Sequence, residues 1–339
     1  MTLFIIGNGF DLSHNLKTSY LDFKNFISEE KPEFLEKIFE FYKYSFKRTY
    51  KNHYSEEMDV ESLLWADFEK NMGSINYKEL LNTNLELNLE YEDSFCDYDY
   101  EIQERYVDKN FEDVPEELLE ILNQWILSID TKLINKKTSF IIAGSKNLFL
   151  TFNYTDTLST VYGIEENKIC HIHGTTETSL IIGHNNLNEI EQLEKLKNDT
   201  FNIILGENNI FDYQEIIEKN DSVFEDNDYK IEQYKYEKII YYYKKTLKNI
   251  KENIEENIDF FEDFFEVKEI IIIGHSLGEV DLPYFKEVLT RVKENTFWKV
   301  YYYKKDEKDI FKEILIKIGI DESNILMCPT EQFFNIKKT

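Results

Sequence analysis

Three short apolar runs, far apart in the chain, each lead directly into a polar turn that carries Gly or Asn. The runs are 2–6, 148–152 and 269–273. Their length and their content of Ile, Leu and Phe predict buried strands. In an open parallel sheet the carboxyl ends of the strands lie along one edge, and ligands bind at that edge. The sequence therefore predicts that the three turns meet in one shared site.

Strands and helices alternate in the last part of the chain, which predicts a parallel α/β sheet. The expected order there is strand, helix, strand and helix, at 270–273, 282–292, 298–303 and 308–318. Two long polar stretches, 30–135 and 187–265, separate the predicted strands and have mostly helical periodicity. We expect one α/β domain over 1–339, a parallel sheet in which these stretches form two large helical insertions.

The acidic composition narrows the class of partner. Among the 339 residues, 66 are Asp or Glu and 39 are Lys or Arg, which gives a formal net charge of -27. A surface this negative repels nucleic acid and anionic membranes, so we expect neither as a partner. A small anion can still bind backbone N–H groups locally at the start of a helix.

The sequence pattern favours a cytoplasmic protein. The amino-terminal residues lack the basic and long apolar segments of a signal peptide, and no apolar run approaches the length of a membrane span. The three cysteines, Cys96, Cys170 and Cys328, have neither disulfide-framework nor metal-ligand spacing. This usage fits a reducing compartment, and we expect no bound metal.

The first turn, Gly7-Asn8-Gly9, follows a predicted strand and precedes a predicted helix. At that place glycines allow the backbone to approach a phosphate closely. Leu12 stands where the dinucleotide-binding fingerprint has its third glycine, so the pattern is incomplete. Asn8 and Asp11 add polar groups that a bare turn does not need. A tight turn without a ligand is the alternative.

The second turn begins with Asn153 and Tyr154. Asn153 is placed to hydrogen-bond a ribose or to position a water. Taken alone, the turn is better explained as an Asx turn that caps the helix starting near Thr157.

Two histidines, His171 and His173, lie on the same face of a short predicted strand that leads to Gly174. Together with His184 they offer three imidazoles for zinc, but no cysteine or regularly spaced carboxylate supports a metal site. A histidine beside a glycine at a strand end is well placed as a general base, because its pKa lies near neutrality. For His171 we favour a partly buried structural role.

The third turn, Gly274-His275-Ser276-Leu277-Gly278, matches the Gly-x-Ser-x-Gly nucleophile elbow of α/β-hydrolases. In those enzymes the catalytic His follows the Ser in the chain, and no His lies beyond position 275. We therefore expect that Ser276 is a ligand-contacting or capping hydroxyl and not a nucleophile.

Taken together, several segments resemble the AbiH family of bacteriophage abortive-infection proteins. They are FIIGNGFDLSHNLKTSYLDF near the start, LWADFE at 64–69, TFNYTDTLSTVYG at 151–163, HIHG with IIGH, and IIIGHSLGEVDLPYF. The matches are scattered over nearly the whole chain. The AbiH pattern is in turn similar to the SIR2-like fold, a Rossmann-type domain that binds NAD.

The SIR2-like similarity implies that Asn153 and His173 are the catalytic pair. Asn153 would hold the nicotinamide ribose or the attacking water, and His173 would act on the ribose hydroxyls or as a base. The implied cofactor-binding residues are Gly7, Asn8, Gly9, Phe10, Asp11, Tyr154, Gly174, Gly274, His275, Ser276 and Asp281. Asp11 is also a catalytic candidate. Thr155 departs from the SIR2-like pattern, because it separates Tyr154 from the acidic residue that follows.

One further catalytic candidate, Glu69, belongs to the AbiH pattern alone. Trp65 and Glu69 are one helical turn apart and face the same side of a predicted helix. Glu69 would reach the site as a second acid or base. The alternative is a helix that simply packs Trp65 on the sheet.

The resemblance implies an antiphage effector, because several SIR2-like bacterial defence proteins hydrolyse NAD during infection. NAD would be the substrate or ligand, and the reaction would be the N-glycosidic cleavage of a glycohydrolase. The alternatives are a non-catalytic nucleotide-binding sensor or toxin component, and a nuclease, against which the net charge counts. A small nucleotide is the expected partner, with a homo-oligomer or a phage-derived trigger as further possibilities.

Overall fold

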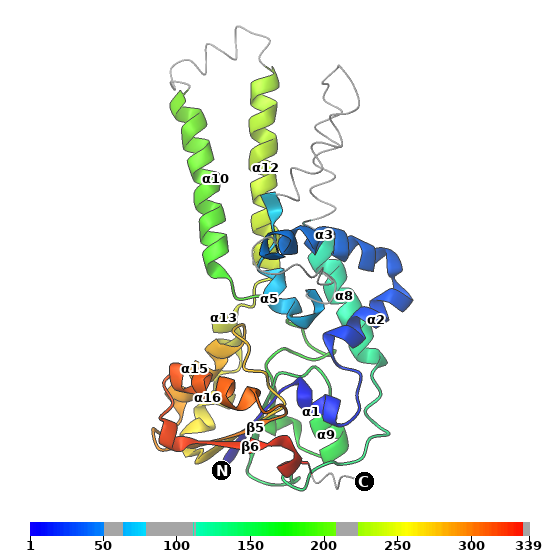
Figure 1. Ribbon diagram of the computed structural model, residues 1–339, viewed down its shortest axis with the longest axis vertical. Coiled ribbons are helices and arrows are strands. Elements are labelled where there is room, and N and C mark those ends of the chain that lie inside the picture. The colour runs from blue at the N-terminus through cyan, green and yellow to red at the C-terminus, as the bar shows by residue number, and fades with distance from the viewer. Residues whose placement is uncertain (51–63, 79–110, 112, 208–222, 335–339) are drawn as a thin grey trace. The chain divides into compact units, whose positions relative to one another are not determined.

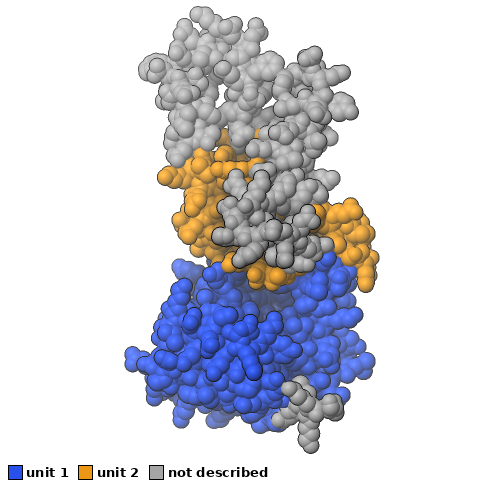
Figure 2. All heavy atoms as spheres, in the orientation of Figure 1, with its two compact units in different colours: residues 1–26, 121–182, 248–339 blue, residues 27–120, 183–247 orange. Residues whose placement is uncertain are grey.

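The computed structural model describes residues 1–50, 64–78, 111, 113–207 and 223–334. The chain folds as two compact units, each made of separate segments of the sequence (Figure 2). An α/β unit contains 1–26, 121–182 and 248–339, and a helical unit contains 27–120 and 183–247. The sequence predicted one domain with helical insertions at 30–135 and 187–265. The helical unit overlaps both stretches and ends earlier than each of them.

The α/β unit is built on one six-stranded sheet in which every strand pair is parallel (Figure 1). The strands are β1 (Thr2–Ile6), β2 (Leu148–Thr151), β3 (Ile169–His171), β4 (Glu269–Ile273), β5 (Phe297–Tyr302) and β6 (Ile325–Pro329). Their order in the sheet is β3-β2-β1-β4-β5-β6. This is the order of a doubly wound dinucleotide-binding sheet, whose direction of winding reverses between β1 and β4. The predicted Rossmann-like α/β fold is confirmed.

The central strands are buried on both faces, as expected for a parallel sheet covered by helices. Alternate residues of β1 enter two different cores: Leu3 and Ile5 enter one, and Phe4 and Ile6 enter the other. Ile6 pairs with Thr151 of β2 and Ile273 of β4, so the three strands end at the same level. The turns that follow them therefore start side by side.

Helices cover both faces of the sheet. On the Phe4 face lie α1 (Asn8–Ser13) and α9 (Thr157–Tyr162), which contribute Phe10, Leu158 and Tyr162 to the core. On the other face lie α14 (Ile258–Glu262), α15 (Leu282–Arg291) and α16 (Glu307–Lys317). The helix α13 (Ile250–Glu256) packs partly buried apolar residues on this second core.

The helical unit has an aromatic core. Its helices are α3 (Pro32–Tyr50), α5 (Phe68–Met72), α10 (Leu187–Glu207) and α12 (Val223–Lys245), and it shares α2 (Tyr20–Glu30) and α8 (Asp113–Ser128) with the α/β unit. Phe41, Tyr42 and Tyr242 pack ring against ring, and Trp65 stacks on Phe68 with ring centroids 4.7 Å apart.

The helices α10 and α12 of this unit run side by side (Figure 1). Two ion pairs, Lys197–Glu237 at 2.5 Å and Lys244–Glu194 at 2.7 Å, connect them. Within the described residues, no helix combines the length and the apolar character needed to cross a membrane.

Candidate active site at the carboxyl edge of the sheet

The turns after β1, β2 and β4 are joined by hydrogen bonds. The backbone N–H of Gly7 donates to the carbonyl of Ile273 at 3.0 Å, and the Asn153 side-chain amide donates to the carbonyl of Gly7 at 3.2 Å. The first turn therefore lies between the other two. The three distant sequence motifs meet at one edge of the sheet, on the two sides of the point where its winding reverses.

The glycines of the first and third turns are required by contact between the two turns. The N–H of Gly9 donates to the carbonyl of Gly274 at 2.8 Å. A Cβ on Gly9 would lie 2.8 Å from the Cα of Gly274. Gly274 has a φ of 70°, and a Cβ there would clash with the backbone of Phe10. Close backbone packing thus explains these glycines without a phosphate.

Several backbone donors of the first turn are already used. Besides Gly7 and Gly9, the N–H of Phe10 donates to the carbonyl of Gly7 at 2.9 Å. The Phe10 side chain is fully buried in the core. Asn8 is exposed, and its side-chain amide donates to the carbonyl of Thr18 at 2.7 Å. The polar groups near this turn that a ligand could contact are therefore mainly side chains.

Asp11 is a buried carboxyl group with one satisfied oxygen. Only 1% of the residue is exposed, and Oδ2 accepts a hydrogen bond of 2.5 Å from the Thr155 hydroxyl. Oδ1 is buried and has no hydrogen-bond partner in the protein. Burial raises the pKa of Asp11 to about 6, although the Thr155 hydrogen bond and the nearby polar side chains of Thr157 and Asn153 oppose the rise.

Asn153 carries a second buried acceptor without a donor. The residue is 6% exposed, and its side-chain Oδ1 has no partner in the protein. The side chain does not cap α9: Asp156 occupies the capping position, and Asn153 donates to Gly7 instead. Most buried polar atoms in proteins are hydrogen-bonded, so two unsatisfied oxygens on adjacent turns, Asp11 Oδ1 and Asn153 Oδ1, mark this place as unusual. We call these two residues the Asp11–Asn153 pair.

A second polar group, which we call the Lys248 cluster, consists of Lys248, His173, Asp281 and His275. The Lys248 side chain has no exposed area. Its Nζ lies 3.1 Å from His173 Nε2 and 3.2 Å from Asp281 Oδ1. His173 Nε2 is 3.3 Å from the same Asp281 oxygen, and His275 Nε2 is 3.6 Å from Asp281 Oδ2.

The charges of this cluster are compensated internally. Burial acts to raise the pKa of Asp281, but the Lys248 ammonium together with His173 and His275 outweighs burial and holds that pKa well below its usual range. Burial lowers the pKa of His275 to about 4, so the ring is neutral at physiological pH. Its Nδ1 accepts a hydrogen bond of 2.9 Å from the N–H of Leu277, which leaves the ring proton on Nε2, toward Asp281.

The geometry around Ser276 differs from a nucleophile elbow. In an elbow the serine itself sits on a sharp, strained strand-to-helix turn. Here Ser276 is exposed and has an ordinary φ, whereas buried Leu277 has a φ of 54°. The next helix, α15, begins only at Leu282. The turn therefore supports the expectation that Ser276 is not a nucleophile.

The remaining predicted residues have local roles or lie elsewhere. The Tyr154 hydroxyl donates to the carbonyl of Ile181 at 2.9 Å. Gly174 has a φ of 77° and closes a loop against Ser179. Glu69 lies in α5 of the helical unit, and its catalytic role stays a prediction.

Two residues of the site escaped the sequence patterns. Lys248 stands among ordinary polar helix residues, and no motif marks it. Thr155 was visible only as a departure from the SIR2-like pattern, yet its hydroxyl is the donor to Asp11. The sequence signals for this contact were Asp11 after the first predicted strand and several threonines at the end of the second.

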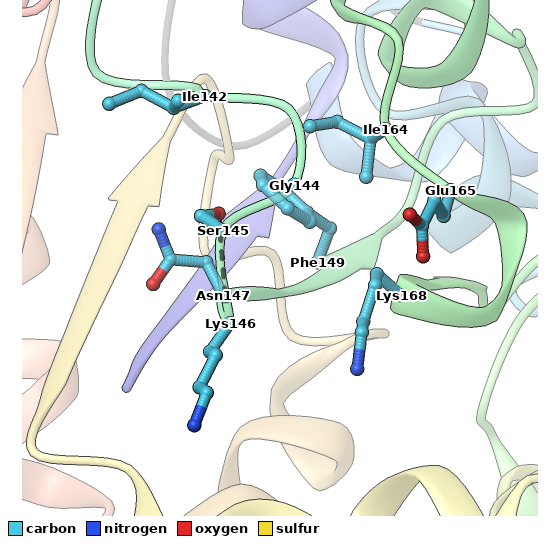
Figure 3. Close-up of a pocket in the computed structure, with 9 residues that line it drawn as sticks. All are labelled: Ile142, Gly144, Ser145, Lys146, Asn147, Phe149, Ile164, Glu165 and Lys168. Atoms are coloured by element: carbon cyan, nitrogen blue, oxygen red, sulfur yellow. Dashed lines mark hydrogen bonds between the residues drawn. The ribbon is translucent and has the colours of Figure 1, made fainter.

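A small pocket of about 180 Å³ lies at the other edge of the sheet (Figure 3). Among its lining residues, Asn147 directly precedes β2 and Lys168 directly precedes β3, so the pocket opens at amino ends of strands. Ligands of doubly wound sheets bind at the carboxyl edge, and the candidate site stays with the three turns.

Fold and site together define a Rossmann-like α/β protein with a polar site at its winding reversal. The family model described as "Bacteriophage abortive infection AbiH" matches residues 3–302. The chain belongs to this family. No curated protein and no solved structure matches the chain.

Proposed function

We propose that this protein is an antiphage effector that binds NAD at the Asp11–Asn153 pair and cleaves its N-glycosidic bond. The observation that carries the proposal is the presence of two buried acceptor oxygens, Asp11 Oδ1 and Asn153 Oδ1, without donors. They lie on adjacent turns at the edge where doubly wound sheets bind nucleotides. A ribose supplies two neighbouring hydroxyl donors, which match two neighbouring acceptors in number and kind.

The same residues suit the chemistry of glycosidic cleavage. Departure of nicotinamide leaves positive charge on the ribose, and a carboxylate held in a low-dielectric site stabilises such charge. Asp11 is mostly ionised above pH 6 and is buried, so it meets both conditions. Water then adds to the sugar carbon and releases a proton, giving ADP-ribose and nicotinamide. Asn153 Oδ1 is an acceptor that could orient this water or the adjacent hydroxyl.

Three amides of the first turn are not available to the phosphates of the ligand. The N–H groups of Gly7, Gly9 and Phe10 already donate within the protein. The exposed side chains of Asn8 and Ser276 provide polar groups on the first and third turns. We therefore assign the ribose to the buried pair and the phosphates to these exposed side chains.

A non-catalytic nucleotide sensor is the second candidate. The observation in its favour is the burial of Asp11 and Asn153, at 1% and 6% exposure, because a ligand seated on them would leave little room for an attacking water. A sensor would bind the nucleotide unchanged and pass the signal to another part of the protein or to a partner.

Product analysis separates the two candidates. The purified protein is incubated with NAD, NADP and ATP, and release of nicotinamide, adenine or phosphate is measured. Cleavage of NAD predicts free nicotinamide from the wild type and at least a hundredfold slower release by Asn153→Ala, because a transition-state contact is lost. Asn147→Ala is the matched control, since Asn147 precedes β2 and Asn153 follows it.

The same variants connect chemistry to defence. We expect plaque assays to show loss of protection with Asn153→Ala and retained protection with Asn147→Ala. Binding of NAD by wild type without any product would support the sensor. Full activity and full protection with Asn153→Ala would show that the site assignment is wrong.

A further inference from the structure

The contacts of the buried Lys248 ammonium indicate a specific role for this side chain in the site. Its fully buried Nζ, His173 Nε2 and Asp281 Oδ1 form a triangle with sides of 3.1, 3.2 and 3.3 Å. The ammonium of a lysine only donates hydrogen bonds, and an ionised carboxylate only accepts them. The imidazole nitrogen does either, depending on which ring nitrogen carries the proton. The triangle therefore determines the tautomer of His173.

Two arrangements of protons are conceivable in this triangle. In the first, Lys248 donates to both neighbours, and His173 Nε2 is an acceptor. In the second, His173 Nε2–H donates to Asp281, and Nε2, which then carries a hydrogen, lies 3.1 Å from the ammonium nitrogen of Lys248. The His173–Asp281 separation of 3.3 Å exceeds the usual 2.7–3.2 Å of an N–H···O bond. The Lys248–His173 distance of 3.1 Å is within the usual range for a hydrogen bond, so the distances favour the first arrangement.

We propose that Lys248 is a positioning residue that fixes His173 as the neutral tautomer with its proton on Nδ1. In this tautomer the lone pair of Nε2 accepts the hydrogen bond from Lys248. Among the described residues, none hydrogen-bonds the Nδ1 of His173, and the hydrogen on Nδ1 is the one available to a ligand.

The tautomer of His173 also matters for catalysis, and this consequence rests on the proposed function. His173 donates a hydrogen bond to the ligand and does not act as its general base. The proton released by the attacking water then goes to another acceptor. Asp11 has an unpartnered oxygen and a pKa raised to about 6, which suits it to that task.

Nitrogen-15 NMR of the histidine rings tests the tautomer directly. The chain has 6 histidines, so selective ¹⁵N-histidine labelling gives few signals, and the His173 signals are those lost in His173→Gln. We expect a protonated Nδ1 and a bare Nε2 in wild-type His173. His275 is the internal control, because its Nδ1 accepts from Leu277 and its proton must be on Nε2. A wild-type His173 with its proton on Nε2 would overturn the proposal.

Substitution of Lys248 tests the cause. In Lys248→Met, the nearest partner of His173 Nε2 is the Asp281 carboxylate, which only accepts, so the proton should move to Nε2. Lys248→Arg keeps a donor and should keep the wild-type tautomer. A folded Lys248→Met with an unchanged tautomer would also overturn the proposal. If Lys248→Met does not fold, the wild-type spectrum decides alone. These spectra need no nucleotide, so a failure to cleave NAD does not affect them.

Discussion

The Asp11–Asn153 pair and the Lys248 cluster lie at the same edge of the same sheet, but their hydrogen-bonding groups are matched differently. In the Lys248 cluster a buried ammonium lies between a carboxylate and an imidazole, so each charge has a partner. In the Asp11–Asn153 pair two buried oxygens have no donor. A matched cluster is complete in the protein alone, whereas unmatched acceptors are completed only by a molecule that brings donors. Loss of a charge from the first should therefore act mainly on stability, whereas changes to the second should alter ligand binding and the pH dependence of stability.

The largest expected effect is on stability, in Lys248→Met. Removing the ammonium leaves the Asp281 carboxylate buried without its counter-charge, which costs about 3–5 kcal/mol of unfolding free energy. The double variant Lys248→Met/Asp281→Asn removes both charges and should regain most of this loss. Urea unfolding of wild type and both variants at pH 7 measures the difference. A change below about 1 kcal/mol in the single variant would show that the cluster is not matched in this way.

The Asp11–Asn153 pair predicts a different signature, a stability that depends on pH. Because the pKa of Asp11 is raised from its ordinary 3.8 to about 6, the folded state holds a proton that the unfolded state loses. Stability from this group is present below pH 3.8 and is lost as the pH rises through 6. The loss amounts to about 3 kcal/mol, and Asp11→Asn abolishes it.

The unfolding free energy must be measured for both wild type and Asp11→Asn, because the wild type alone does not isolate the contribution of Asp11. The pKa of His275 is lowered to about 4, so its contribution is lost as the pH falls from 6.5 to 4, in the opposite direction. The difference in unfolding free energy between Asp11→Asn and wild type removes this term. We expect that difference to grow in favour of Asp11→Asn between pH 4 and pH 7. A difference independent of pH would contradict the raised pKa.

The convergence of the turns was predictable from sequence, because strand ends of a parallel sheet share one edge. Gly7, Asn153 and Gly274 could be placed together on that ground alone. The reason for the glycines could not be predicted from sequence, since the clash of a Cβ on Gly274 with Phe10 depends on how closely two backbones approach. The phosphate interpretation and the packing interpretation predict the same residue type.

Other parts of the site depend on contacts that no local pattern records. Lys248 lies 75 positions beyond His173 in the chain and meets it only because the chain returns from the helical unit at that point. Thr155 is a donor to Asp11 across 144 positions. The helices α13 and α14 lie within the predicted second insertion, yet their apolar residues pack on the sheet. Amphipathic periodicity indicates that a helix packs, but not against what.

The smallest expected effect is that of Ser276→Ala. The side chain is exposed on the third turn, so its loss should change the unfolding free energy by less than about 0.5 kcal/mol. As a phosphate contact it should weaken NAD binding by no more than about tenfold. A serine-directed fluorophosphonate should leave the wild-type protein unlabelled. Stoichiometric labelling of Ser276 would instead identify a covalent nucleophile.

The most direct test of whether NAD binds at Asp11 is calorimetry of NAD binding that also measures the protons released. Ligand hydroxyls that donate to Asp11 stabilise its ionised form, so binding should lower the pKa of Asp11 and release protons near pH 6. Titrations in buffers of different ionisation enthalpy measure this release. We expect proton release by wild type and by Asn147→Ala, and none by Asp11→Asn. Absence of NAD binding, or equal proton release by wild type and Asp11→Asn, would contradict this expectation.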